Sequence, residues 1–214
     1  VDEYYINGWI NDELTKQYAD NGLIRVAPTE NCFRECGNVK RPINSMADMT
    51  GLKIRVPETQ ACQDFYTALG AIPAAIATSE TLAALEQGTV DGVDNSIYNM
   101  KSMGVLEKIK YITMLNYMYS GASITCSEEF WNSMTANQQA AFKQAADEAG
   151  AFFRENMRAD EQTILDQGSF EVEEIDPSSD FYKQMKEKAV ELWAGYASEY
   201  PSDIMDRINQ DFSV

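Results

Sequence analysis

The stretch from 51 to 95 constrains the fold most, because strand and helix signals alternate along it. It opens with GLKIRVP at 51–57, which has the alternating apolar pattern of a short strand and is ended by a proline. Helical patterns follow at 59–69 and 79–87, each stopped by a glycine, and a strand is predicted at 89–93. This alternation predicts an α/β fold with a largely parallel sheet.

Capping signals mark where several helices are expected to begin. Ser79 is the predicted cap of the second helix in this stretch. Thr135 and Gln138 form a capping-box pattern, from which a helix is predicted to run to about Gln167 and to end at Gly168. The other predicted elements are helices at 5–20, at 96–109 and from 178 or 179 onward, and strands at 23–28, 111–117, 122–126 and 170–175. Residues 30–50 are predicted to be rich in turns.

Arg55 lies at the C-terminal end of the predicted strand, on the face opposite to its alternating apolar residues, Leu52, Ile54 and Val56. In open α/β sheets this end of the strands opens on the ligand crevice. The planar, permanently charged guanidinium fits a carboxylate through two parallel hydrogen bonds. The position therefore indicates a receptor for a small organic acid. An ion pair with one of the chain's 34 acidic residues is the structural alternative.

Charge and residue content exclude several classes of function. The 34 acidic and 17 basic residues leave a net charge of −17, which disfavours nucleic acid and anionic membranes as partners. The chain has no histidine, which excludes Ser-His-Asp and Cys-His catalysis. No apolar run reaches the ~20 residues of a membrane span. The four cysteines lack a zinc-ligand pattern, so no metal site is predicted, although a Cys32–Cys36 disulfide is permitted in an exported protein.

Several motifs, in their order and spacing, resemble those of one protein family. GLKIRVP is followed by ALGA at 68–71, SETLAALEQG at 79–88 and VDGVDN at 90–95. Upstream, FRECGNVKRPIN at 33–44 resembles the family's G-F-R and K-R-P-I segment, and the helical segment 128–149 is similar to a family helix that follows a strand. The family comprises the substrate-binding proteins of tripartite ATP-independent periplasmic (TRAP) transporters, and the resemblance covers nearly the whole chain.

The resemblance implies a two-lobed, periplasmic-binding-protein-like α/β fold with a cleft between the lobes and a long helix bridging them. Lobe I is expected at 1–33 and 121–160, and lobe II at 34–120 and 161–214. Judged against the family, the N-terminal part of lobe I is missing from this sequence. A protein whose signal peptide has been removed is expected, in the periplasm or another extracytoplasmic compartment, with a lipid anchor as an option.

The implied function is that of an extracytoplasmic solute receptor, not an enzyme. It would bind a small organic carboxylate in the cleft, close around it by hinge motion and deliver it to the integral membrane subunits of a TRAP transporter. No cofactor, no nucleic acid and no direct insertion into a membrane is expected. The alternative is a ligand-sensing receptor of the same fold that acts on a signalling partner. A histidine-free hydrolase based on paired carboxylates has no second supporting feature.

Three polar residues match ligand-binding positions of the family. Arg55 matches the arginine that forms a salt bridge with the ligand carboxylate. Arg34 matches the arginine of the G-F-R segment, although Cys32 replaces the usual glycine, and a hinge-stabilising arginine is the alternative. Asn95 matches an asparagine that hydrogen-bonds the carboxylate or a neighbouring hydroxyl, and an ordinary Asx turn is the alternative.

Three further residues are candidate pocket residues by position. Thr78 stands where many members carry a bulky residue over the ligand, which indicates a roomier or more polar pocket and hints at a hydroxylated or differently shaped acid. Tyr98 and Tyr119 are expected to line the pocket, and placement in the core or on the surface is the alternative for both.

Overall fold

The computed structural model describes residues 1–212 of the 214-residue chain, and these fall into two compact units. Unit 1 comprises residues 1–34, 96–99 and 116–168. Unit 2 comprises residues 35–95, 100–115 and the described residues from 169 onward. Each unit has its own sheet, and both are assembled from segments that are distant in the sequence.

Unit 2 is built on a six-stranded mixed sheet. Its strands are, in spatial order, β4 (Ile72–Ala75), β3 (Lys53–Val56), β5 (Gly92–Asn95), β2 (Glu35–Asn38), β6 (Tyr111–Met114) and β8 (Glu171–Glu174). The first three are parallel, β2 is antiparallel to both of its neighbours, and β8 is parallel to β6. The prediction of a largely parallel sheet is therefore wrong around β2, because the turn residues of that segment hid its strand character.

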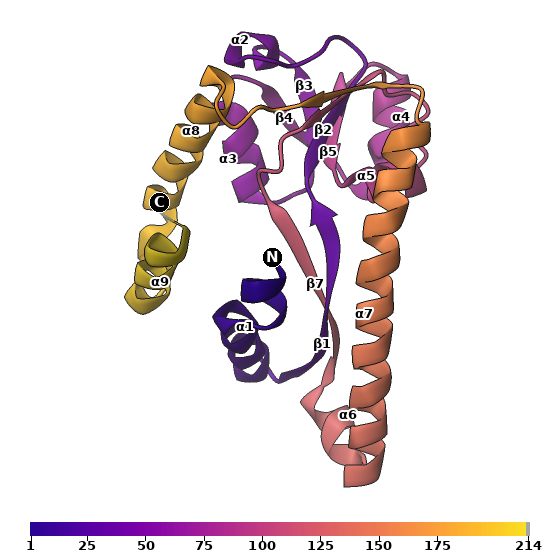
Figure 1. Cartoon of the computed structure of the whole chain (residues 1–214), viewed down its shortest axis with the longest axis vertical. Coiled ribbons are helices and arrows are strands. Elements are labelled where there is room, and N and C mark those ends of the chain that lie inside the picture. Colours follow the sequence, from indigo (N-terminus) through magenta and orange to yellow (C-terminus); the bar gives the residue numbers. More distant parts are fainter. Residues whose placement is uncertain (213–214) are drawn as a thin grey trace. The chain divides into compact units, whose positions relative to one another are not determined.

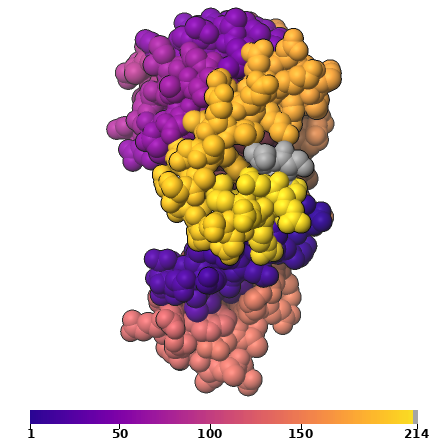
Figure 2. Space-filling model, turned by 90° about the vertical axis from the view of Figure 1, so that its left-hand side faces the viewer, coloured from indigo at the N-terminus to yellow at the C-terminus, as the bar shows by residue number. Residues whose placement is uncertain are grey.

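The core of unit 2 is apolar and almost fully enclosed. Its buried side chains include Ile43, Met49, Leu52, Ile54, Val56, Leu69, Val93, Met100 and Ile112. The helical elements of unit 2 include α2 (Met46–Met49), α3 (Gln60–Ala68), η2 (Thr78–Glu80), α4 (Thr81–Glu86), α8 (Asp180–Tyr196), η3 (Ala197–Glu199) and α9 (Ser202–Phe212). Helix α8 packs on α2 and α3, and its outer side forms with α9 the yellow surface of Figure 2.

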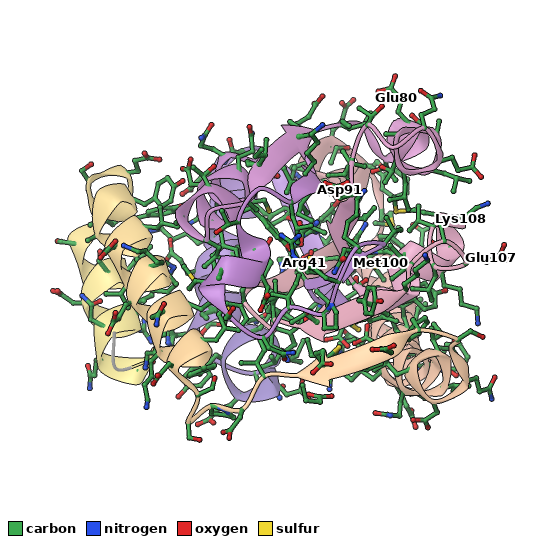
Figure 3. All side chains as sticks on the ribbon, turned by 90° about the horizontal axis from the view of Figure 1, so that it is seen from above. Arg41, Glu80, Asp91, Met100, Glu107 and Lys108 are labelled. Carbon is green, nitrogen blue, oxygen red and sulfur yellow. The ribbon has the colours of Figure 1, made fainter. Side chains whose placement is uncertain are left out.

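Two glycines allow close packing in this sheet, one between strands and one against neighbouring side chains. A Cβ atom on Gly92 would lie 2.5 Å from the backbone oxygen of Gly37, so no side chain fits there. A Cβ atom on Gly37 would lie 3.1 Å from the sulfur of Met100, which is labelled in Figure 3. The glycine of the VDGVDN motif is therefore explained by the close approach of β5 to β2.

Unit 1 is built on two long antiparallel strands, β1 (Leu23–Phe33) and β7 (Tyr119–Ser127), with α7 (Ala136–Gln167) alongside (Figure 1). Its other elements are η1 (Asp2–Ile6), α1 (Trp9–Asp20), α6 (Glu128–Ser133) and the first half of α5 (Ile97–Ser102), which ends in unit 2. One core cluster of unit 1 consists of Val26, Ala27 and Ala146, with Ile24, Ile124, Cys126, Trp131 and Phe142 packed against it.

The long helix predicted from the capping box is confirmed as α7. The Thr135 hydroxyl accepts a hydrogen bond from the backbone N–H of Gln138, and the Gln138 side chain accepts one from the backbone N–H of Thr135. The helix ends at Gln167 and is followed by Gly168. It belongs to unit 1 over its whole length, and a bridging role stays a prediction. Within residues 1–212, every helix falls short of the length or the apolarity that a membrane span requires.

Two predicted helix starts are wrong. Ser79 lies inside η2, and α4 begins only at Thr81, without a side-chain cap. The helix predicted at 5–20 is interrupted, because a π-helical turn precedes Gly8 and α1 begins after it. A Cβ atom on Gly8 would lie 2.2 Å from the backbone oxygen of Glu3, so the chain needs glycine at this break.

Candidate functional site

The C-terminal ends of β4, β3 and β5 lie at one edge of the sheet in unit 2, and three predicted ligand residues lie there. Arg55 is the penultimate residue of β3, Thr78 follows β4, and Asn95 ends β5. Because β3 is parallel to both β4 and β5, these three strand ends point the same way. This edge is where ligands bind in open α/β sheets. The topology therefore brings these three residues to one edge of a single unit.

The guanidinium of Arg55 is held by groups that follow β4. Only 2% of the residue is exposed, and its neighbour Ile54 is 0% exposed, so both faces of the sheet are covered at this point. Its Nε donates to the carbonyl oxygen of Ile76 at 2.8 Å, and its Nη2 lies 3.4 Å from the hydroxyl oxygen of Thr78. Contacts at two different nitrogens fix the plane of the guanidinium. A planar donor in a fixed orientation and shielded from water is suited to bind a carboxylate.

Thr78 sits on a short, hydrogen-bonded turn. The carbonyl oxygen of Ala77 accepts from the backbone N–H of Glu80 at 3.0 Å and from the hydroxyl of the buried Thr81 at 3.2 Å. Thr78 itself is exposed and is the first residue of η2. Its hydroxyl therefore lies at the surface of unit 2 while it contacts the buried Arg55.

Asn95 lies beside buried acidic residues. It is 9% exposed, and its amide nitrogen lies 3.3 Å from the sulfur of Met103. Glu35 of β2 is its partner across the antiparallel pair, and both Glu35 and Asp94 are fully buried. The hydroxyl of Tyr66 lies 3.4 Å from the Oδ1 atom of Asp94. An asparagine amide carries both donor and acceptor atoms, so this side chain has the chemistry to orient a ligand group at this edge.

The cysteines are thiols in the described part of the chain, so the permitted Cys32–Cys36 disulfide is not formed. Burial raises the pKa of the Cys36 thiol to about 12, with a smaller contribution from the nearby Asp94 carboxylate. Burial also raises the pKa of Cys32 to about 12. Both thiols are therefore protonated and unreactive at neutral pH.

Tyr119 lies in unit 1, in a network around the buried Glu30. Its hydroxyl donates to Glu30 at 2.5 Å, and Arg158 of α7 donates to the same carboxylate through Nε at 2.6 Å and Nη2 at 2.8 Å. Arg158 also pairs with Asp2 at 2.7 Å. Burial, together with the hydrogen bond to Glu30, raises the pKa of Tyr119. A ligand carboxylate that accepted a hydrogen bond from the Tyr119 hydroxyl would therefore have to displace Glu30.

Arg34 and Tyr98 also lie in unit 1. Arg34 is buried, and its backbone N–H donates to the carbonyl oxygen of Met118 at 2.9 Å. The backbone N–H of Tyr98 and the thiol of Cys32 hydrogen-bond the carboxyl group of Glu161 on α7. Burial raises the pKa of Glu161. The segments that contain Cys32 and Tyr98 are thereby hydrogen-bonded to α7 of the same unit.

Sequence reasoning missed Glu30, Glu35 and Arg158. The hydrogen bonds between Arg158 and Glu30 join residues 128 positions apart, and no local pattern carries such a link. Glu35 follows Arg34 in a segment predicted as turn-rich, so its place in a central strand gave no signal. Within residues 1–212, no group of three or more histidine, cysteine, aspartate or glutamate side chains is arranged to hold a metal ion.

Comparison with known proteins identifies relatives. The family model described as bacterial extracellular solute-binding protein, family 7, matches residues 1–199. A solute-binding protein of Verminephrobacter eiseniae is 30% identical over 156 residues, which are 73% of this chain and 47% of that protein. The C4-dicarboxylate-binding periplasmic protein of Rhodobacter capsulatus is 28% identical over 166 residues, which are 76% of this chain and 50% of that protein. The chain thus spans about half the length of these curated relatives.

A solved structure shows the same fold. The TRAP periplasmic solute-binding protein from Polaromonas sp. JS666, bound to D-erythronate, is 30% identical to this chain, with a TM-score of 0.81. The match covers 95% of this chain and 67% of that chain. The predicted α/β fold of the two-lobed periplasmic binding proteins is thereby confirmed. The chain belongs to the bacterial extracellular solute-binding proteins of family 7, the TRAP solute-binding proteins, whose members are receptors for transport and not enzymes.

Proposed function

We propose that this protein is the solute receptor of a TRAP transporter and binds a small organic carboxylate through Arg55. The observation that carries the proposal is the buried guanidinium at the C-terminal edge of β3, oriented by the carbonyl oxygen of Ile76. The names of two relatives support it. One is described as binding C4-dicarboxylates and the other is bound to D-erythronate, and both ligands are organic acids.

In this proposal Arg55 supplies the charge, and Thr78 and Asn95 supply hydrogen bonds to the ligand. Charge-assisted, bidentate hydrogen bonds are stronger where water is excluded, as around Arg55. The expected lobe II, 34–120, includes Arg34, Tyr98 and Tyr119, whereas these three residues lie in unit 1. We propose that the two units act as the two lobes and that these three residues reach the same ligand when the lobes close. Closure is then favoured by the ligand's higher affinity for the closed state.

The proposed partners are the integral membrane subunits of the transporter, which would recognise the closed, ligand-bound form. This places the protein in the periplasm or another extracytoplasmic compartment, and a lipid anchor is compatible with that location. The family supports these assignments, since it comprises extracellular solute-binding proteins.

A thermal-shift screen of small organic acids tests the proposal. The purified protein is used with any residues that flank this sequence in its natural chain. An acid present at ~100 times its Kd is expected to add ~2.7 kcal/mol to the free energy of unfolding. Arg55→Ala is expected to weaken binding by ~2–5 kcal/mol, which corresponds to roughly tens to thousands in Kd.

Arg41→Ala is the matched control. Arg41 also belongs to unit 2, is labelled in Figure 3, and donates to backbone carbonyls, those of Asp48 and Thr50. It is therefore expected to lower stability without changing the affinity for the acid. If both variants bind the acid as the unmodified protein does, Arg55 has only a structural role and the proposal fails.

A further inference from the structure

We propose that this site selects acids that carry a hydroxyl or keto oxygen on the carbon next to the carboxylate, and that Thr78 makes the selection. The inference rests on the proposed function, in which Arg55 binds the carboxylate. It adds the chemical class of the ligand, which the family does not define, since relatives are described with ligands as different as C4-dicarboxylates and D-erythronate.

The first step is the contact between the two side chains. The Nη2 atom of Arg55 lies 3.4 Å from the Oγ1 atom of Thr78, so the hydroxyl oxygen acts as acceptor, because a guanidinium has only donors. A threonine hydroxyl has one donor and two acceptor lone pairs. After the contact with Arg55, the O–H donor and one lone pair of Thr78 stay available to another group.

The second step is the position of this hydroxyl. Arg55 is 2% exposed whereas Thr78 is exposed, so the hydroxyl lies at the surface directly beside the buried guanidinium. A carboxylate paired with Arg55 would place the substituents of its neighbouring carbon next to Thr78. An oxygen on that carbon can accept from the threonine O–H, whereas a methylene group cannot.

The third step is that the hydroxyl is held in place before a ligand binds. The carbonyl oxygen of Ala77 accepts two hydrogen bonds, from the Glu80 backbone and from the buried Thr81 hydroxyl, which fix the turn. The β-branched side chain of threonine has few χ1 rotamers. Little conformational entropy is then lost on binding, which favours selection at this position.

The alternative is that Thr78 only orients Arg55. In that case replacing its hydroxyl weakens all acids alike, whatever stands on the neighbouring carbon. If Thr78 contacts the ligand, the replacement removes the preference between an acid and its deoxy analogue. The two roles therefore differ in a ratio of affinities and not in affinity alone.

The test measures Kd by titration calorimetry for paired acids: lactate with propionate, malate with succinate, and 2-hydroxyisovalerate with isovalerate. The hydroxy member of the best-binding pair is expected to bind about tenfold more tightly, the change that one hydrogen bond typically gives. Thr78→Ser keeps the hydroxyl and should keep this ratio. Thr78→Val keeps the shape and should bring the ratio close to one, while its unfolding temperature without ligand stays near that of the unmodified protein.

Each other outcome has a defined meaning. If Thr78→Val weakens both members of a pair equally, or leaves the tenfold ratio intact, the inference is overturned while the carboxylate receptor stands. The same holds if both members bind equally tightly to the unmodified protein. If no acid of any pair binds, or if Arg55→Ala binds all of them unchanged, the proposed function fails and the inference fails with it.

Discussion

Both units bury charged side chains, but they differ in how much apolar core surrounds them. The strands of unit 2 bury Glu35, Arg55 and Asp94 among many apolar residues, of which Ile54, Val93 and Ile112 are each 0% exposed. In unit 1 the two strands bury charged residues beside fewer apolar ones. Arg25 is 7% exposed and hydrogen-bonds Ser123, while Glu30 is 1% exposed and pairs with Arg158.

The difference follows from the size of the sheets. A sheet of six strands can enclose apolar side chains on both faces, whereas two strands and one long helix give a small apolar cluster. Unit 2 is therefore stabilised mainly by burial of apolar area, and unit 1 to a larger extent by hydrogen bonds and ion pairs. The ion pair between Glu30 and Arg158 includes a side chain that is 44% exposed, so unit 1 should respond to salt more than the apolar core of unit 2 does.

The largest expected effect is that of a core substitution in unit 2. Ile54→Ala should lower the free energy of unfolding by about 2–5 kcal/mol, because the enclosed core cannot collapse around the cavity. The matched substitution in unit 1 is Ile24→Ala, at a half-buried position of β1, and it should cost less than half as much. Urea unfolding measures both. Equal losses would contradict the contrast between the units.

The next effect concerns the buried charge in unit 1. Glu30→Gln leaves Arg158 without one of its carboxylates and should cost about 1–3 kcal/mol at low salt. Because the Arg158 side chain is 44% exposed, added salt should reduce this loss, whereas it should leave the loss at Ile54 unchanged. Urea unfolding at two salt concentrations measures this. A loss that does not depend on salt would mean that packing, not charge, explains the role of Glu30.

The smallest effect is a change in pH dependence at Glu161. Its pKa is raised in the folded protein, so the folded state binds more protons than the unfolded chain between the ordinary glutamate pKa and the raised value. Stability therefore falls as pH rises through this window, and Glu161→Gln should remove that fall. Unfolding temperatures across the acidic range measure the difference between variant and parent. A difference that is constant with pH would show that Glu161 does not titrate in this window.

Local signals in the sequence predicted the elements that depend on residues a few positions apart. The capping box of Thr135 and Gln138 predicted the start of α7, because both of its hydrogen bonds lie within four residues. The alternation of Leu52, Ile54 and Val56 likewise predicted β3. For the candidate site, the same strand pattern predicted that Arg55 stands at the end of a strand.

What the sequence by itself determined is therefore the identity of the strands and helices around Arg55 and the family to which their order of motifs belongs. Only the tertiary structure decided that Arg55 is buried on a sheet covered on both faces, that Thr78 contacts it, and that Glu35 lies opposite Asn95. It also decided that the hydroxyl of Tyr119 is bound to Glu30. The physical reason is that these contacts join strands and loops distant in the chain, so they depend on strand order and direction, which no local pattern encodes.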